Sequence, residues 1–288
     1  MVFIAVTGEW IARTVGRFCG LFLLCTVSSH ATEASADALC QNHELTVSAG
    51  PVQSRWQEHD QSGETLLTER GLLMKNGAGW RATCGQWALQ LEGSRVAGHR
   101  LYKGVTNLRQ PVDTISEIRT HELDAQAWHS FAQAWALGAR YLWRTSDRDL
   151  KSVGSVLGYM ERYKQTALAF GLQHTQDWTT HGRLKSHIWM GTGLQGHLDV
   201  TLPGMDAATL PLGRLHYWAA GVQWSGCRTG ANEAGWFCEM ALDYQSERSS
   251  QGATQAIYRN GDLRASVSQP ATRHQSLTFK LGAHYRFN

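Results

Sequence analysis

The most constraining feature of this sequence is the strict alternation of apolar and polar side chains over residues 277–287. Successive side chains of a β-strand point to opposite faces, so alternation with a period of two indicates a strand with one apolar and one polar face. About ten residues are also enough for a tilted strand to cross a lipid bilayer. The apolar face carries Leu277, Phe279, Leu281, Ala283, Tyr285 and Phe287, and the polar face carries Thr278, Lys280, Gly282, His284 and Arg286.

Four residues of this strand also form a pattern, in which Lys280 and Gly282 are followed by Tyr285 and Phe287. The pattern resembles the C-terminal assembly signal of bacterial outer-membrane β-barrels, which most often ends on the aromatic residue, whereas here Asn288 follows. The resemblance implies insertion by the barrel assembly machinery into the outer membrane of a Gram-negative bacterium. Outer-membrane lipid and lipopolysaccharide would then surround the protein. The alternative is an edge strand of a soluble sheet.

The composition of the chain agrees with a membrane barrel. Hydrophobic residues make up 42% of the 288 residues, which is low for a bundle of membrane-spanning helices but suits a barrel, where only alternate strand residues meet lipid. The chain holds 12 Trp, 8 Tyr and 8 Phe, residue types that gather at both membrane interfaces. A net charge of +3 is too small to indicate nucleic-acid binding. We therefore expect an all-β, antiparallel, up-and-down transmembrane barrel.

The start of the chain has the features of a secretory signal peptide. Two arginines precede an apolar run over residues 18–27, and Ala31 follows at a position suited to cleavage, with Ala38 as a second candidate. We therefore expect a signal peptide over residues 1–31 and a barrel domain over residues 32–288. A helical membrane anchor is the alternative, but the apolar run is short for a helix that spans a bilayer.

Ten strands are expected in the mature chain, because alternating segments are separated by turn signals. An even number of strands places both termini in the periplasm, as in single-chain bacterial barrels. The longest connection, over residues 247–274, would then lie outside the cell, where binding loops are common. The expected strands are 44–59, 64–75, 86–104, 114–127, 134–146, 154–172, 182–199, 212–225, 235–247 and 274–287.

Four cysteines remain after removal of the signal peptide, and an even number in an exported protein suggests disulfides. Cys40 and Cys84 flank the first expected hairpin, while Cys227 and Cys238 flank the hairpin between the eighth and ninth strands. Cys40–Cys84 and Cys227–Cys238 are therefore the preferred pairs. Simple alternation puts Cys227 and Cys238 on opposite faces, so the second pair requires a β-bulge near the turn. Free buried thiols are the alternative, and the spacing suggests no metal site and no cofactor.

The residues expected inside the barrel carry both signs of charge, together with histidine and glutamine. A turn centred between residues 150 and 151 would place Arg140 opposite Glu161, so we expect an ion pair between them in the lumen. On the seventh strand, uninterrupted alternation directs His197 and Asp199 inward. Ten strands enclose little more space than side chains fill, so this mixed lining favours a plug of ion pairs over an open pore.

Two enzymatic alternatives can be weighed against the sequence. An omptin-like hydrolase would use carboxylates and a histidine at the outer rim to activate water, but the order His-x-Asp here is the reverse of the Asp-x-His of that family. A lipid hydrolase would use a His-x-Ser pair, with the histidine as the base for the serine nucleophile. The residues concerned are His197, Asp199, Asp147 and Asp149 for the first alternative, and His274 and Ser276 for the second.

The sequence therefore favours a structural or surface-binding barrel with a narrow, polar, plugged lumen over an enzyme. A selective small-solute channel is the alternative, but it would need a lumen lined by one sign of charge or by exposed aromatic side chains. Arg162 and Lys164 point outward near the top of the sixth strand, where they could meet anionic lipid head groups. A solvated strand end explains these two residues equally well.

Overall fold

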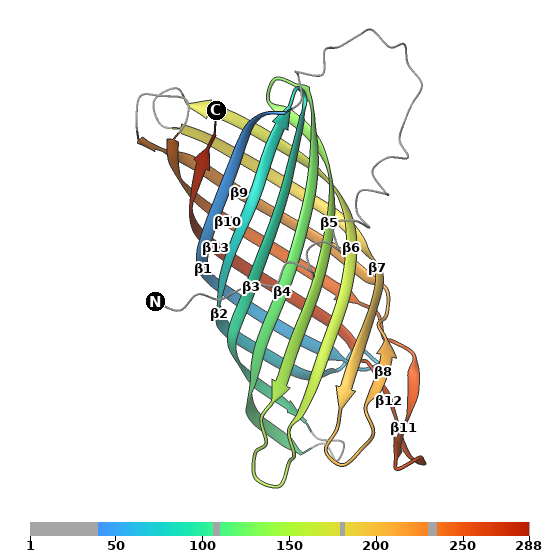
Figure 1. The fold of residues 1–288 in the computed structure, drawn as a ribbon. Helices are drawn as coiled ribbons and strands as arrows, with labels where there is room; N and C mark the ends of the chain where they lie inside the picture. Colours follow the sequence, from blue (N-terminus) through green and yellow to red (C-terminus); the bar gives the residue numbers. More distant parts are fainter. Residues whose placement is uncertain (1–39, 106–109, 179–181, 230–234, 288) are drawn as a thin grey trace, which may run out of the picture. The chain divides into compact units, whose positions relative to one another are not determined.

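The computed structural model describes residues 40–105, 110–178, 182–229 and 235–287, which form a closed antiparallel β-barrel (Figure 1). Each strand of the ring pairs with its neighbours, and the pairing of the first strand with the last closes the ring. The ten strands of the ring are β1 (Gln41–His59), β2 (Thr65–Cys84), β3 (Trp87–Val105), β4 (Pro111–Ala132), β5 (Trp135–Leu150), β6 (Tyr159–Trp178), β7 (Gly182–Thr201), β9 (Leu215–Thr229), β10 (Gly235–Ser249) and β13 (Ala271–Arg286).

The connections at the two ends of the barrel differ in length. At the end that carries both described termini, β2 and β3 are joined by residues 85–86, and β4 and β5 by residues 133–134. At the other end, residues 151–158 join β5 to β6, and residues 250–270 join β10 to β13. Outer-membrane barrels have short periplasmic turns and longer extracellular loops. We therefore refer to the end with the termini as the periplasmic end and to the other as the extracellular end.

The connection between β10 and β13 is an ordered extension and not the continuous long loop that the sequence suggested. It contains the hairpin of β11 (Thr254–Arg259) and β12 (Asp262–Ser268), which projects at the end opposite to the C-terminus (Figure 1). Asn260 and Gly261 form its turn with positive φ angles of 53° and 84°, the combination that a tight hairpin turn favours. The short strand β8 (Ala208–Pro211) extends the sheet beside β7 at the same end.

The outer face of the barrel is apolar and the inner face is largely polar, the inverse of a soluble barrel. Large apolar side chains such as Leu72 and Met190, each 68% exposed, project outward from the strands. The alternation expected over residues 277–287 is confirmed, because Leu281 is exposed on the outside while Lys280 lines the interior. None of the described residues forms a helix long and apolar enough to cross a membrane.

Part of the inner wall is apolar, where two tryptophans lie over glycines. A side chain at Gly138 would collide with the Trp128 ring, and one at Gly171 would collide with the Trp189 ring. The two indole rings are 4.3 Å apart and join a buried cluster of small and aromatic side chains on the wall from β4 to β9. Glycine at these two positions therefore lets both rings lie against the wall and fill part of the lumen.

A β-bulge in β7 reverses the orientation of its extracellular half. Thr166 of β6 pairs with Gln195, but the next residue pairs with Gly193, so Leu194 is an extra residue in β7. The prediction that His197 and Asp199 face the lumen is therefore wrong. Leu198 and Val200 point inward, with 3% and 5% of their surfaces exposed, and the residues between and beside them point outward.

The cysteine predictions have different outcomes. Cys40 and Cys84 form the expected disulfide, which joins the periplasmic ends of β1 and β2. The side chain of Cys227 lies outside the described residues, as does the proposed signal peptide over residues 1–31. The backbone register between β9 and β10 does shift between Trp236 and Cys238, as the second pair requires. The Cys227–Cys238 disulfide itself stays a prediction.

Candidate functional site: a sealed polar lumen

The lumen is organised around three arginines of β5, Arg140, Arg144 and Arg148. They are four residues apart, so all three project from the same face of the strand at intervals of about 13 Å. Each guanidinium forms hydrogen bonds with carboxylates of other strands. We call these three residues the arginine ladder.

Arg148 is the most enclosed step of the ladder, with only 2% of its surface exposed. Its guanidinium lies 2.9 Å from Glu58 Oε1, 2.7 Å from Glu69 Oε1 and 2.6 Å from Glu161 Oε2. Arg100 adds a second cation 3.6 Å from Glu69. Five charged groups from β1, β2, β3, β5 and β6 therefore meet in one layer across the lumen, where each compensates the desolvation of another.

Two buried apolar clusters adjoin this layer near the extracellular end of the barrel. The first comes from β2 to β5 and the second from β6 to β8, and both contact Trp56 and Tyr159. The two clusters therefore meet across the lumen. Their buried members are Leu67, Tyr102, Val112 and Leu150 in the first, and Tyr163, Leu198, Val200 and Leu210 in the second. We call these clusters, together with Trp56 and the Arg148 layer, the outer plug.

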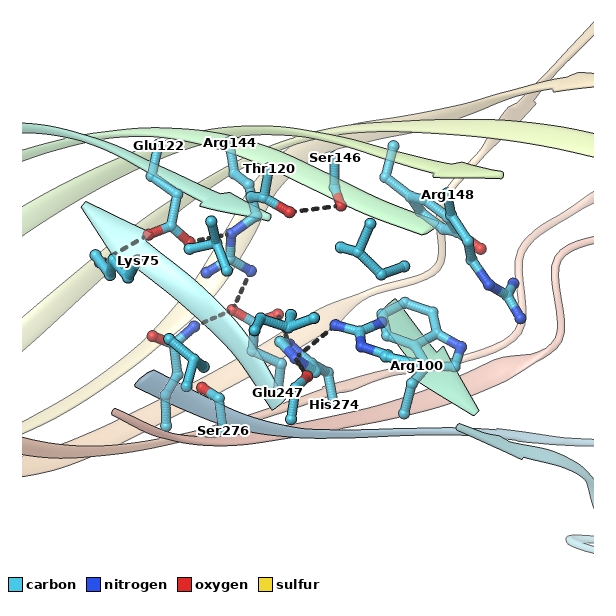
Figure 2. A pocket seen from close by; sticks show the side chains of 18 of the residues that line it. Lys75, Arg100, Thr120, Glu122, Arg144, Ser146, Arg148, Glu247, His274 and Ser276 are labelled. Carbon is cyan, nitrogen blue, oxygen red and sulfur yellow. Dashed lines mark hydrogen bonds and ion pairs between the residues drawn. The ribbon is translucent and has the colours of Figure 1, made fainter. Parts of the chain in front are cut away.

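Arg144 forms the next layer, towards the periplasm (Figure 2). It donates hydrogen bonds to Glu122 over 2.8 Å and to Glu247 over 2.6 Å, and Lys75 also lies 3.0 Å from Glu122. The cavity between this layer and the outer plug has a volume of about 70 Å³, which is room for a few water molecules. This part of the lumen is therefore filled mainly by its own ion pairs.

Arg140 does not pair with Glu161, so that prediction is wrong. Arg140 donates to both carboxylate oxygens of Asp124, over 3.0 and 2.6 Å, and contacts the hydroxyl of Tyr217. Glu161 lies opposite Arg148 in the pairing of β5 with β6. The cause is the eight-residue loop 151–158, which moves the centre of the turn towards the C-terminus and brings a later residue of β6 opposite each residue of β5.

His274 faces the lumen and interacts with residues on both neighbouring strands. Its Nε2 lies 3.1 Å from Ser54 Oγ and 3.4 Å from Arg100, and its Nδ1 lies 3.6 Å from Glu247. A serine, a histidine and a carboxylate in this order could support acyl transfer if a substrate reached the serine. Ser54 is buried beside the same small cavity, so the hydrogen bonds have a structural role here.

The lipid-hydrolase alternative required His274 and Ser276 to meet lipid. Both side chains instead line the cavity next to the outer plug (Figure 2). The hydroxyl group that the structure brings to His274 belongs to Ser54. The geometry therefore gives no support to this alternative.

The residues of the omptin-like alternative lie on the outer surface of the barrel. Asp147 forms an ion pair of 2.6 Å with Arg162, and Asp199 forms one of 3.1 Å with Lys164. Arg162 stands between the two aspartates in the strand register, so they do not converge on a common water. Asp149 pairs with a lysine of the adjoining loop. His197 has the same outward orientation, which follows from the bulge at Leu194.

The four residues of the C-terminal pattern have different environments. Lys280 faces the lumen 3.3 Å from Asp243. The Tyr285 ring contacts Phe287 on one side and Trp236 on the other, with ring centres 4.8 and 5.3 Å away. Gly282 lies close to the backbone of β1. The aromatic pair thus forms part of an aromatic group at the periplasmic end of the barrel, where interfacial residues are expected.

The arginine ladder was missed by the sequence analysis, although a signal for it is present. Arginines at positions 140 and 144 share one parity in the expected strand 134–146, Arg148 continues that parity just beyond its expected end, and lumen-facing acids occur on several other strands. Three cations on the inner face of a narrow barrel require acidic partners from the other walls. The identity of those partners depends on loop lengths, which the alternation does not reveal.

Replacement of Arg148 by methionine is expected to destabilise the barrel strongly. The change would leave three buried glutamates without their shared cation, which should lower the free energy of unfolding by about 3–5 kcal/mol. The matched control is Arg162→Met, which breaks an exposed pair and should cost less than about 1 kcal/mol. Urea unfolding of the detergent-folded proteins, followed by tryptophan fluorescence, measures both values. Equal losses in the two variants would contradict the role assigned to Arg148.

Comparison with known proteins agrees with this architecture. No protein family matches the sequence, and no curated protein is similar to it. The outer membrane protease OmpT from Escherichia coli superposes with a TM-score of 0.52 at 12% identity, over 89% of this chain and 100% of that one. The translocator domain of the autotransporter NalP from Neisseria meningitidis has a TM-score of 0.43 at 12% identity, over 96% of each chain. At this identity the likeness concerns the fold alone, and that fold is the bacterial outer-membrane β-barrel.

Proposed function

We propose that this protein is an outer-membrane barrel that does not conduct solutes and serves a structural or surface-binding role. The observation that carries the proposal is the outer plug. In the Arg148 layer the charged groups are held by one another, and the apolar clusters beside them meet at Trp56 and Tyr159. An ion that crossed it would have to separate buried ion pairs and enter an apolar layer, both of which are costly.

The proposal predicts that the protein carries no ion current across a planar lipid bilayer. The wild-type protein should give no stepwise ion currents, because the outer plug separates the polar lumen from the extracellular side. The double variant Trp56→Ala/Tyr163→Ala should conduct, since it removes two aromatic side chains where the apolar clusters meet. Single-channel recording measures both proteins.

The matched control is Trp135→Ala, which removes an exposed outward-facing ring and should stay silent. Currents through the wild-type protein would overturn the proposal and favour the selective channel. Silence of the Trp56→Ala/Tyr163→Ala variant would show that the barrel is closed by other residues than those assigned here.

We also propose that the protein reaches the outer membrane by way of its C-terminal pattern, which the assembly machinery would recognise. Lys280 and Gly282 belong to the same pattern as Tyr285 and Phe287. Replacing Tyr285 and Phe287 together by alanine is expected to reduce the amount of folded protein in outer-membrane fractions several-fold. Replacing the similarly exposed Phe131 by alanine is the control and should leave it unchanged. Normal membrane levels of the double variant would contradict this assignment.

The surface-binding part of the proposal concerns four outward-facing arginines near the extracellular end. Arg55 of β1 pairs in register with Arg70 of β2, and Arg273 of β13 pairs with Arg248 of β10. Like charges directly opposite each other destabilise a sheet unless counter-ions compensate them. None of the four forms an ion pair within the described part of the chain. We call these residues the arginine belt.

The position of the arginine belt suits the head groups of the outer leaflet. It begins one outward-facing position beyond exposed apolar residues such as Leu72. Long basic side chains at this depth can reach the interface and contact phosphates. The Nε atoms of Arg55 and Arg273 are buried without a hydrogen-bond partner, which leaves donors unsatisfied in the protein alone. We therefore propose lipopolysaccharide phosphates as the partner of the arginine belt.

Arg162 and Lys164, the lipid-binding candidates of the sequence, are less suited to this role. Each has an aspartate as an ion-pair partner on a neighbouring strand. Their charges are therefore largely compensated within the protein, whereas the arginine belt has no such partner among the described residues.

The double variant Arg55→Gln/Arg273→Gln is expected to bind lipopolysaccharide about 30-fold more weakly than the wild type, since each basic residue near an anionic surface contributes about 1 kcal/mol. The measurement is the rise in thermal stability of the detergent-folded barrel as lipopolysaccharide is added. The control Arg119→Gln/Arg162→Gln removes two outward-facing arginines that lie beside carboxylates, and it should retain the response. An unchanged response in the first variant would exclude the arginine belt as the binding site.

A further inference from the structure

The periplasmic end of the lumen holds a cavity of about 240 Å³ that is separate from the outer plug. Its wall carries more basic than acidic side chains. The basic residues are Arg81, Arg183, Lys185 and Arg286, and the acidic residues are Glu44 and Glu239. The imbalance is unusual in this lumen, where the residues of the arginine ladder are matched by carboxylates.

Both acidic residues of this cavity are already engaged by other groups. Arg286 donates two hydrogen bonds to Glu44 Oε1, over 2.8 and 2.6 Å. Glu239 Oε2 lies 3.8 Å from His284 Nδ1. Arg183 in turn is satisfied outside the cavity, since it forms an ion pair of 2.5 Å with Asp177.

Arg81 and Lys185 are the two cations that remain. In the described part of the chain neither forms an ion pair or a side-chain hydrogen bond, although Lys185 has only 6% of its surface exposed. Arg81 lies on β2 and Lys185 on β7, and four strands separate these two in either direction around the ring. The two side chains therefore reach the cavity from opposite walls. Both also line the adjoining cavity of about 120 Å³ in the middle of the barrel.

Glu44 and Glu239 attract both cations, but from beyond ion-pair distance. A buried cation without a close partner is costly, and water alone compensates it incompletely. An anion between Arg81 and Lys185 would accept charge-assisted hydrogen bonds from both. A guanidinium presents paired donors that match two oxygens of one oxyanion. A chloride ion has no second acceptor atom and cannot bind in this way. Uncharged donors such as Asn42 and Thr83 complete the wall on the periplasmic side. The chemistry of the cavity therefore fits a small oxyanion better than a cation or an apolar solute.

We propose that Arg81 and Lys185 form a binding site for a small oxyanion, such as inorganic phosphate or a solute with a phosphate group, that enters the lumen from the periplasmic end. The site lies on the periplasmic side of the outer plug. It therefore does not depend on whether the extracellular end conducts, and a failure of either proposal leaves the other in place.

Isothermal titration calorimetry of the folded, full-length barrel with sodium phosphate at constant ionic strength tests the site. The wild-type protein should show saturable binding with one phosphate per barrel. Lys185→Met and Arg81→Met should each weaken that binding at least tenfold. The control Lys151→Met makes the same chemical change at an exposed extracellular loop, where the lysine pairs with Asp149, and should leave phosphate binding unchanged.

A second measurement tests the claim that Lys185 lacks a partner in the protein. Without phosphate, Lys185→Met should unfold in urea at the same or a higher midpoint than the wild type, because it removes a buried charge that has no partner within ion-pair distance. A large loss of stability would show that Lys185 serves a structural contact. Absence of phosphate binding to the wild type, or equal binding of chloride at the same ionic strength, would overturn the proposal.

Discussion

The contact between Arg148 and its three glutamates is the interaction on which the rest of the lumen depends. A closed ring of ten strands forces inward-facing side chains towards one axis, so a charge placed there must find its partner on another wall. The apolar outer face would tolerate a slip of two residues between neighbouring strands, since the alternation would be preserved. The ion pairs of the arginine ladder would be broken by such a slip, because each arginine needs a particular carboxylate opposite it. The polar interior therefore fixes the strand register that the lipid-facing surface leaves open.

The alternation of side chains, together with the turn signals, the composition and the C-terminal resemblance, predicted the barrel and its ten strands, and the alternation alone predicted the faces of the C-terminal strand. The prediction from alternation failed where a single extra residue reversed which side chains face the lumen. Leu194 is one extra residue in β7, and beyond it Leu198 and Val200 turn inward while His197 and Asp199 turn outward. Polarity could not reveal this change, because the lumen within the outer plug is itself apolar and suits leucine and valine as well as lipid does.

The partners of the arginine ladder could not be predicted for a different reason. Pairing across a hairpin depends on the centre of its loop, and the loop 151–158 holds its own small bridge between Val153 and Val156. A sequence with several glycines and serines there gives no single position for the turn. The sequence therefore predicted an ion pair of Arg140 with Glu161, whereas Glu161 forms its ion pair with Arg148. By contrast, Cys40 and Cys84 were paired correctly because their hairpin is nearly symmetric.

The pairing of β1 with β13 has a consequence for the order in which the molecule can form. Cys40 and Cys84 both belong to the first hairpin, so their disulfide can form before any later strand is present. The free edge of β1, however, pairs with β13, which lies more than 200 residues further along the chain. The contact of Arg286 with Glu44 joins residues that are 242 positions apart. Arg144 and Glu247, which are 103 residues apart, likewise meet only when β10 takes its place in the ring. We infer that the ion pairs between the two ends of the chain form only when β10 and β13 close the ring late in folding, whereas those of the Arg148 layer need only β1 to β6.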